Sequence, residues 1–263
     1  FINGRYLREL SDWELPKGIR ATPLREANGA VDAYLARYAA YQDRAFVALN
    51  TANFEAGACI EIPKGAVIEE PIHLVFFATG GNVPVISHPR SLVVIGPGSQ
   101  ATVVESYLGH GAKYFTNAVT EIVVGEHSVV DHYKLQEEDE RSFHVATLQV
   151  QIGRDANFSS HSISLGGGLV RNDINAVLAE GSEATVNGLY LVSGSQHVDN
   201  HTAIDHAKPH GTSHELYKGI LGGTSTAVFN GKIIVHQDAQ KTDAKQTNRN
   251  LVLSENATIH TKP

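Results

Sequence analysis

Short runs of apolar residues recur along the chain from about residue 59 to its end, and many are rich in β-branched and aromatic side chains. Glycine separates many of these runs, and no long helical pattern lies between them. This arrangement favours strands joined by turns over alternating strand–helix units. The strands predicted most clearly lie at 72–77, 91–96, 120–125, 145–153 and 185–194.

The first fifty residues follow a different pattern. Apolar residues recur at helical spacing after Asn28, so we expect a helix over 30–41 with Asn28 as its N-terminal cap. A second helix is predicted over 45–54. The residues that share one face of the first helix are Val31, Tyr34, Leu35 and Tyr38. The chain therefore divides into 1–55, the end of a helical region plus a linker, and 56–263, a body of strands.

The most specific feature is an internal repeat. Four-residue motifs that begin with glycine and end with a small residue start at Gly98, Gly125, Gly153 and Gly181, at intervals of 27, 28 and 28 residues, and Pro209 continues the period. A period near 28 with two or three strands suits one coil of a parallel β-helix. A β-sandwich with evenly spaced turns is the alternative. The fourth residues, expected to stack inward on successive coils, are Ala101, Ser128, Ala156 and Ala184.

Composition narrows the possible functions. The net charge of −7 gives no reason to expect nucleic acid or an anionic membrane as the main partner. No apolar run approaches the roughly 18–20 residues that cross a bilayer. The single cysteine, Cys59, permits no intrachain disulfide, and one thiolate cannot supply the four ligands that an iron–sulfur cluster usually takes. We expect Cys59 to be buried and structural.

A group of histidines is the candidate metal site. Imidazole and carboxylate suit iron or zinc, so His201, His206 and His210 are the candidate ligands. Their spacing of four or five residues does not match the two-residue period that places side chains on one face of a strand. Surface or hydrogen-bonded histidines are therefore the favoured interpretation. The full group is His197, His201, His206, His210 and His214, with Asp199 and Asp205 among them.

A basic series near the end of the chain is the candidate partner interface. Lys241, Lys245 and Arg249 recur every four residues and could form one basic face, with solvated charge as the alternative. The final strand-like run, at 257–261, would leave unpaired backbone groups that recruit other strands. We find no catalytic triad, and Gly166–Gly168 lacks the lysine of a phosphate loop. The chain is therefore not expected to be an enzyme.

Several longer stretches resemble one known family. They are QHVDNHTAIDHAKPH at 196–210, SHELYKGIL at 213–221, AVFNGKIIV at 227–235 and AQKTDAKQTNRNLVLSENATIHTKP at 239–263. Together they resemble the SufB/SufD family of iron–sulfur cluster assembly proteins. The opening FINGRYLRELS and the segment IPKGAVIEEPIHL at 62–74 are more similar to the SufD branch than to the SufB branch.

The resemblance implies a right-handed parallel β-helix flanked by helical ends. It also implies a cytoplasmic, non-catalytic scaffold subunit of the SufBCD complex. SufB would bind through the β-helix, or a second copy through the same C-terminal end, and the ATPase SufC through a region that follows Pro263 in the family. No catalytic residue carries over. The whole complex would hold a transient iron–sulfur cluster, with a flavin left open, whereas this segment alone would hold neither.

The chain starts at Phe1, contains no methionine and stops directly after a predicted strand, which predicts a piece of a longer protein. The alternative function is a β-helix enzyme that acts on polysaccharide. Such an enzyme would need acidic and basic residues clustered on one sheet at the coil period. Instead, Asp131, Ser159 and Asn187 are predicted to stack there.

Overall fold

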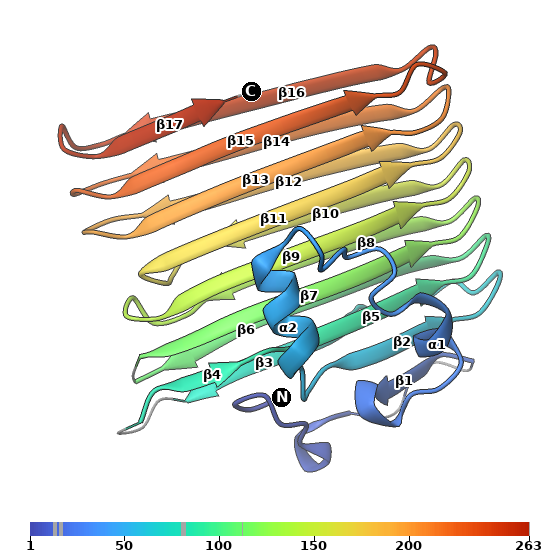
Figure 1. Ribbon diagram of the computed structural model, residues 1–263, viewed down its shortest axis with the longest axis horizontal. Coiled ribbons are helices and arrows are strands. Elements are labelled where there is room, and N and C mark those ends of the chain that lie inside the picture. Colours follow the sequence, from blue (N-terminus) through green and yellow to red (C-terminus); the bar gives the residue numbers. More distant parts are fainter. Residues whose placement is uncertain (13–14, 16–17, 80–82, 112, 263) are drawn as a thin grey trace.

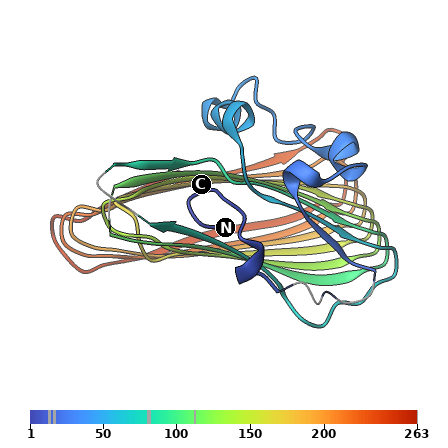
Figure 2. The same cartoon turned by 90° about the horizontal axis from the view of Figure 1, so that it is seen from below.

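The computed structural model describes residues 1–12, 15, 18–79, 83–111 and 113–262, and it has the architecture of a parallel β-helix (Figure 1). Successive coils stack along one axis, and each coil contributes strands to two facing sheets (Figure 2). The predicted parallel β-helix is therefore confirmed, and a β-sandwich is excluded because the described strands from β2 to β17 pair in parallel between neighbouring coils, whereas β1 is added antiparallel to β2.

Two sheets account for the strands of the described residues. Sheet A has the order β16-β14-β12-β10-β8-β6-β3, and sheet B has the order β1-β2-β5-β7-β9-β11-β13-β15-β17, with β4 beside β7. The strands of sheet A are β3 (Ile72–Thr79), β6 (Gln100–His110), β8 (Val129–Glu137), β10 (Asn157–Ser164), β12 (Glu183–Val192), β14 (Thr212–Leu221) and β16 (Asp243–Val252). The strands of sheet B are β1 (Arg20–Pro23), β2 (Ala58–Ile62), β4 (Val85–Ser87), β5 (Arg90–Ile95), β7 (Tyr114–Val124), β9 (Phe143–Ile152), β11 (Leu169–Leu178), β13 (His197–His206), β15 (Thr226–Val235) and β17 (Thr258–Lys262).

The alternation of side chains explains the core. In β11 and β13, every second residue is buried, because a strand directs successive side chains to opposite faces. The inward residues of the two sheets meet in one core that runs along the axis and includes Ile60, Ile122, Ile174 and Leu221. The five strands predicted most clearly from the sequence correspond to β3, β5, β7, β9 and β12, and the run at 257–261 corresponds to β17.

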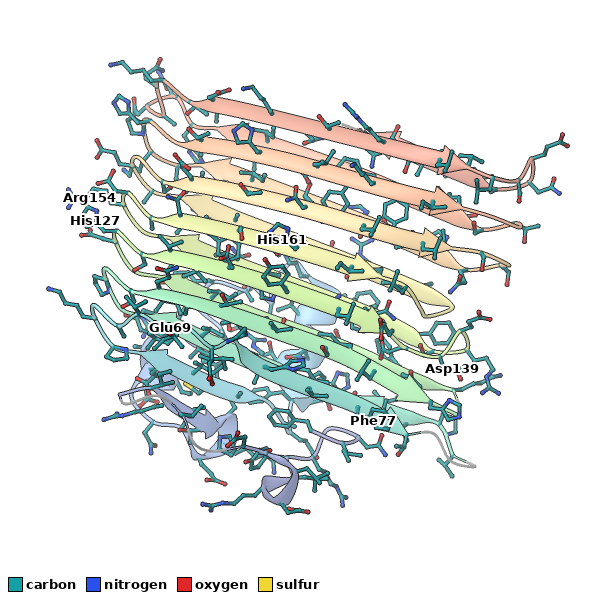
Figure 3. The ribbon with its side chains drawn as sticks, turned by 180° about the vertical axis from the view of Figure 1, so that it is seen from behind. Glu69, Phe77, His127, Asp139, Arg154 and His161 are labelled. Carbon is teal, nitrogen blue, oxygen red and sulfur yellow. The ribbon has the colours of Figure 1, made fainter. Side chains whose placement is uncertain are left out.

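One turn in each coil contains a residue in the left-handed region of backbone conformation. Figure 3 shows this edge of the solenoid at His127 and Arg154, opposite the edge at Asp139. In the turns that lead from sheet B to sheet A between β5 and β16, the left-handed residues are Gly98 (φ 68°), His127 (58°), Asp155 (52°), Gly181 (66°), His210 (63°) and Lys241 (60°). The repeated motifs are therefore not at equivalent positions in their turns. The left-handed residue is the first residue of the motifs at Gly98 and Gly181, but it is the third residue of the motifs at Gly125 and Gly153.

Gly125 and Gly153 serve a different purpose. A Cβ atom at Gly125 would lie 2.6 Å from the backbone nitrogen of Pro97, and one at Gly153 would lie 2.8 Å from that of Glu126. Glycine is needed at both positions because the backbone of the preceding coil approaches closely.

The small fourth residues of the motifs do face inward, as predicted, and each is at most 2% exposed. They do not form a single stack, however, and that part of the prediction is wrong. Ala101 aligns with Val130, and Ala184 aligns with Phe158. Ser128 and Ala156 align with each other, because the residues that follow them, Val129 and Asn157, are paired. This row lies two residues before the row that contains Val130 and Phe158. The offset follows directly from the shifted motifs.

The first helix is shorter than predicted. The helix α1 (Ala30–Tyr34) ends where Leu35 turns extended and Ala36 adopts a φ of 59°. Gly29 occupies the N-terminal cap position, and no side chain caps the helix, so the prediction that Asn28 caps it is wrong. The short 3₁₀ helices η1 (Arg8–Leu10) and η2 (Leu24–Glu26) precede α1.

A buried carboxylate ends this helix early. Glu121 on β7 is fully buried and accepts the backbone N–H groups of Ala36, Tyr38 and Ala39 at 2.9, 3.2 and 3.0 Å. These N–H groups are drawn to the carboxylate instead of continuing the helical pattern. Arg90 completes the site with its Nη2 2.5 Å from Glu121 Oε2.

The second helix is confirmed to within one residue as α2 (Ala45–Asn53). It lies on the outer face of sheet B, where Asn50 donates to the carbonyl oxygens of Pro89 and Asn117 at 2.9 and 2.8 Å (Figure 1). No described helix is long and apolar enough to cross a membrane. Cys59 is buried on β2 as expected, and burial, with the charge of Glu61, raises its pKa to about 11.

Candidate functional site

The candidate metal ligands do not come together. His201 points outward from β13, where its Nε2 lies 2.7 Å from Asp199. His206 is five residues further along the strand and therefore points inward, with its Nε2 2.9 Å from the hydroxyl of Ser213. His210 lies in the following turn. Within the part of the chain that the structure describes, no group of three histidine, cysteine or carboxylate residues is arranged to hold a metal ion.

The basic series lies on the last coil. Lys245 and Arg249 both point outward from β16, and Lys241 lies in the turn before it. Lys245 is near Asp243 at 3.4 Å, and both side chains are largely exposed. The structure therefore places the three residues on one coil, spread along it at intervals of four residues, or about 13 Å within the strand. Their contact with a partner stays a prediction.

The strands of the same coil pair on one side only among the described residues. Among the described residues, β16 pairs only with β14, and β17 pairs only with β15. The N–H groups of Asp243 and Leu253 bond back to Gly211 and Leu221 of the preceding coil, at 3.1 and 2.7 Å. Because hydrogen bonds alternate sides along a parallel strand, the N–H groups of the even-numbered residues between them face the open end. This edge could accept a further strand.

The sequence reasoning missed a cluster of charged side chains between the two sheets. Glu105 on β6 is 2% exposed, and its carboxylate lies 3.1 Å from His132 and accepts a hydrogen bond from Thr120 at 2.7 Å. Burial alone would raise the pKa of Glu105, but His132, Thr120 and the charge of Lys134 outweigh burial and lower it. The carboxylate is therefore ionised at neutral pH.

A second buried carboxylate lies in the corner after β8. Glu138 accepts hydrogen bonds from Thr116 at 2.7 Å and Gln136 at 3.1 Å, and its Oε2 lies 2.7 Å from His144 Nδ1. Burial opposes ionisation of Glu138, but the nearby His144, Thr116 and Gln136 outweigh burial and lower its pKa. Burial also lowers the pKa of His144, so the hydrogen bonds from Thr116 and Gln136 are the firmer contribution.

Lys134 lies between these carboxylates. Its Nζ donates to Asn172 at 2.5 Å and lies 5.5 Å from the centre of the Tyr107 ring. Burial lowers the pKa of Lys134 to about 8, although Glu105 and Glu138 partly offset the effect. The cavity beside it has a volume of about 20 Å³, which is room for about one water molecule. The cluster balances buried charges and leaves no space for an organic substrate.

On the outer face of sheet A, the predicted stack of Asp131, Ser159 and Asn187 is only partly present. Ser159 aligns with Asp131 and donates a short hydrogen bond to it. Asn187 does not continue this row. It aligns with His161, whose Nδ1 lies 3.3 Å from its amide nitrogen.

Glu215 is a buried carboxyl group without a hydrogen-bond partner among the described residues. It lies on β14 between Val186 and Gln246, is 3% exposed, and neither carboxylate oxygen makes a hydrogen bond of good geometry with a described residue. Burial raises its pKa to about 7, and the hydroxyl of Thr202 offsets only part of this effect.

Replacement of Glu215 by glutamine is expected to stabilise the protein at alkaline pH. A folded-state pKa of about 7, above the ordinary value of 4.5, means that the contribution of Glu215 to stability is fully present below about pH 4.5 and is lost as the pH rises through 7. At about 1.4 kcal/mol per pH unit, Glu215→Gln should increase the free energy of unfolding by about 3 kcal/mol at pH 8 and by little at pH 4.5. Urea denaturation at both pH values measures this difference. An equal effect at the two pH values would show that Glu215 does not titrate in this range.

These features define a class of protein. The molecule is a solenoid whose interior is filled and whose charged interior groups are enclosed, and none of its described cavities beside those groups has room for an organic substrate.

Comparison with known families gives the particular assignment. The family model described as "SUF system FeS cluster assembly, SufBD core domain" matches residues 76–263, and that described as "SufBD protein N-terminal region" matches residues 1–74. The chain belongs to the SufBD family of iron–sulfur cluster assembly proteins.

Relatives of known designation agree. An "Iron-sulfur cluster assembly SufBD family protein" of Synechocystis is 35% identical over the whole chain, and the "Iron-sulfur cluster assembly protein SufD" of Escherichia coli is 31% identical over the whole chain. The chloroplastic protein ABCI7 of Arabidopsis thaliana is 32% identical over 78% of the chain and 45% of its own length. The chain spans 61% and 62% of the first two relatives. The resemblance inferred from the sequence is confirmed.

Proposed function

We propose that the chain is a non-catalytic scaffold subunit of a SufBCD-type complex that assembles iron–sulfur clusters in the cytoplasm. The observation that carries the proposal is the match of the two family models over residues 1–74 and 76–263. The candidate docking surface is β16 and β17, which pair on one side only among the described residues and lie beside Lys241, Lys245 and Arg249. A parallel strand from a SufB-like partner would extend the sheets, and acidic side chains on that partner would meet the basic face.

The same proposal assigns the chemistry to the assembled complex. The chain contributes one buried cysteine, and its charged interior residues already bind one another. A nascent cluster would therefore be cargo held between subunits, and a flavin, if the complex uses one, would bind outside this segment. SufC would dock elsewhere, and self-association through the last coil is the alternative to SufB binding.

A proline in β16 tests the proposed edge. Ala244 has an even number, so its N–H faces the open end, and Ala244→Pro should leave the coil intact because proline is tolerated on an edge strand. We expect the variant to lose co-purification with SufB, measured by pull-down, while its melting temperature stays close to that of the wild type. SufC without SufB should not be captured by either form.

Side-chain variants separate the two parts of the interface. Lys245→Ala combined with Arg249→Ala should weaken SufB capture and reduce its sensitivity to salt without abolishing it, because exposed charges contribute modestly. Undiminished SufB capture by the folded Ala244→Pro variant would show that the last coil is not the docking edge. Direct capture of SufC would show that the SufC surface has been placed wrongly.

A further inference from the structure

The outer face of sheet A is uncovered over its whole described area. Both α1 and α2 lie on the side of sheet B, and no helix covers the opposite side (Figure 2). Figure 3 looks onto this open face, with His161 near its centre. Parallel sheets are usually covered on both faces, so the exposed face of sheet A calls for an account of what meets it.

The centre of this face is aliphatic. Ile163 and Leu165 point outward from β10 and its end, and Leu189 and Leu191 point outward from β12. Leu165, Leu189 and Leu191 are 40%, 41% and 46% exposed. Contiguous exposed apolar side chains of this kind mark interaction surfaces.

Charges of opposite sign lie on the two sides of this centre. On β8, one strand before β10, Asp131 and Glu137 point outward. On β14, one strand after β12, His214 and Lys218 point outward. The acidic strand β8 and the basic strand β14 are therefore equally distant from the line between β10 and β12. A rotation of 180° about this line brings β8 of one copy opposite β14 of another, so the face is complementary to itself.

We propose that the outer face of sheet A binds the same face of a second copy of this chain. The two-fold axis lies in the interface, parallel to the strands, between β10 and β12. This axis places β10 against β12 of the second copy and β8 against β14, and it keeps each residue at its position along the strand. The interface is thus isologous, as in most homodimers.

The strand register specifies which apolar residues meet. Ile163 and Leu189 occupy the same position on their strands, so each faces the other residue in the second copy. Leu165 and Leu191, two residues further along, face each other in the same way. One row across the four strands β8, β10, β12 and β14 contains Tyr133, His161, Asn187 and Leu216. Because the axis exchanges β8 with β14, Tyr133 faces Leu216 of the second copy.

The polar residues are matched by the same operation. Asp131 shares its row with His214, so the two meet across the interface. His161 faces Asn187 of the second copy, repeating a contact that the two side chains already make within the chain at 3.3 Å. Lys218 faces the row of Leu135, directly beside Glu137.

The size of the face predicts a weak dimer. Four strands about 4.8 Å apart, each contributing about seven residues of about 3.3 Å, cover roughly 450 Å² per copy. The total of roughly 900 Å² is at the lower end of specific interfaces. We therefore expect a dimer that dissociates on dilution through the micromolar range.

Sedimentation velocity of the full chain over a micromolar concentration series tests the proposal. We expect a concentration-dependent dimer for the wild type and for Ile86→Asp, a matched control because Ile86 is a 64% exposed residue outside this face. Leu189→Asp should raise the dissociation constant at least tenfold. Glu137→Lys and Lys218→Glu should each weaken the dimer, and the double variant should restore it because both charges are exchanged together.

Crosslinking distinguishes this interface from one at the last coil. Cys59 is buried, so Ile163→Cys and Leu189→Cys each carry one reactive thiol. A short bis-maleimide should link a mixture of the two differently tagged variants faster than it links either variant alone. A monomer at all concentrations overturns the proposal. The proposal is also overturned if the Ala244→Pro variant no longer dimerises while the Leu189→Asp variant dimerises like the wild type, because this result would place the contact at β16.

Discussion

Replacement of Ala156 by glutamate should unfold the β-helix or reduce its stability by several kcal/mol. Ala156 is 1% exposed at the entry to β10, and its carbonyl oxygen accepts the N–H of Glu183 from the next coil at 2.9 Å. A carboxylate at this position would be buried between two coils without a partner. Such burial costs several kcal/mol, which is comparable with the roughly 5–15 kcal/mol that stabilises a typical domain.

The neighbouring residue supplies a matched control. Asn157 follows Ala156 directly but points outward and is exposed. Asn157→Glu should therefore melt close to the wild type, whereas Ala156→Glu should melt far lower or fail to accumulate as folded protein. Circular dichroism melts of both variants give the comparison. Equal melting temperatures for Ala156→Glu and the wild type would mean that position 156 faces solvent.

Removal of the Glu121 side chain should detach the N-terminal segment from sheet B. The Glu121→Ala change leaves Arg90, which is 1% exposed, without its counter-ion and leaves three backbone N–H groups of residues 36–39 without their acceptor. Breaking a buried ion pair by removing one partner costs about 3–5 kcal/mol. We expect faster proteolysis within residues 28–54, together with a lower melting temperature.

A double variant separates the ion pair from the backbone contacts. Glu121→Leu combined with Arg90→Met removes both charges and should recover part of the stability lost in Glu121→Leu alone, because no unpaired charge remains. The segment 36–39 should still be more accessible to protease than in the wild type. If Glu121→Ala left both protease resistance and the melting temperature unchanged, Glu121 would not anchor the segment.

The repeat made the coils predictable but not their detailed alignment. Each coil needs one turn with a left-handed residue, so glycine or a tolerant polar residue returns at nearly constant intervals. The motifs at Gly98 and Gly125 look equivalent, yet Gly98 supplies the left-handed turn and Gly125 a close backbone approach. The 27-residue interval between them was the available signal, and only the hydrogen-bond register shows that the two motifs are offset.

The interior charges were hidden for a related reason. Glu105, His132 and Lys134 lie in strands, where charged side chains normally face solvent. Whether each of these side chains points into the core or out of it depends on its position in the two-residue alternation of the strand. His206 and His201 differ in the same way. Once one inward residue such as Val103 is fixed, the two-residue period identifies Glu105 as inward. Their mutual pairing depends on contacts between coils and could not be predicted from the sequence.

The stacking of coils, each paired only with its neighbours, also governs how the molecule comes apart. Each coil is supported only by its immediate neighbours, so the free energy needed to open a coil depends on its distance from an unprotected end. Loss of the last coil turns β14 and β15 into the new edge and brings Glu215 next to water, where it can ionise readily. Opening above neutral pH would therefore advance by whole coils rather than by single strands, and any chain segment that covers β16 and β17 would suppress it throughout the stack.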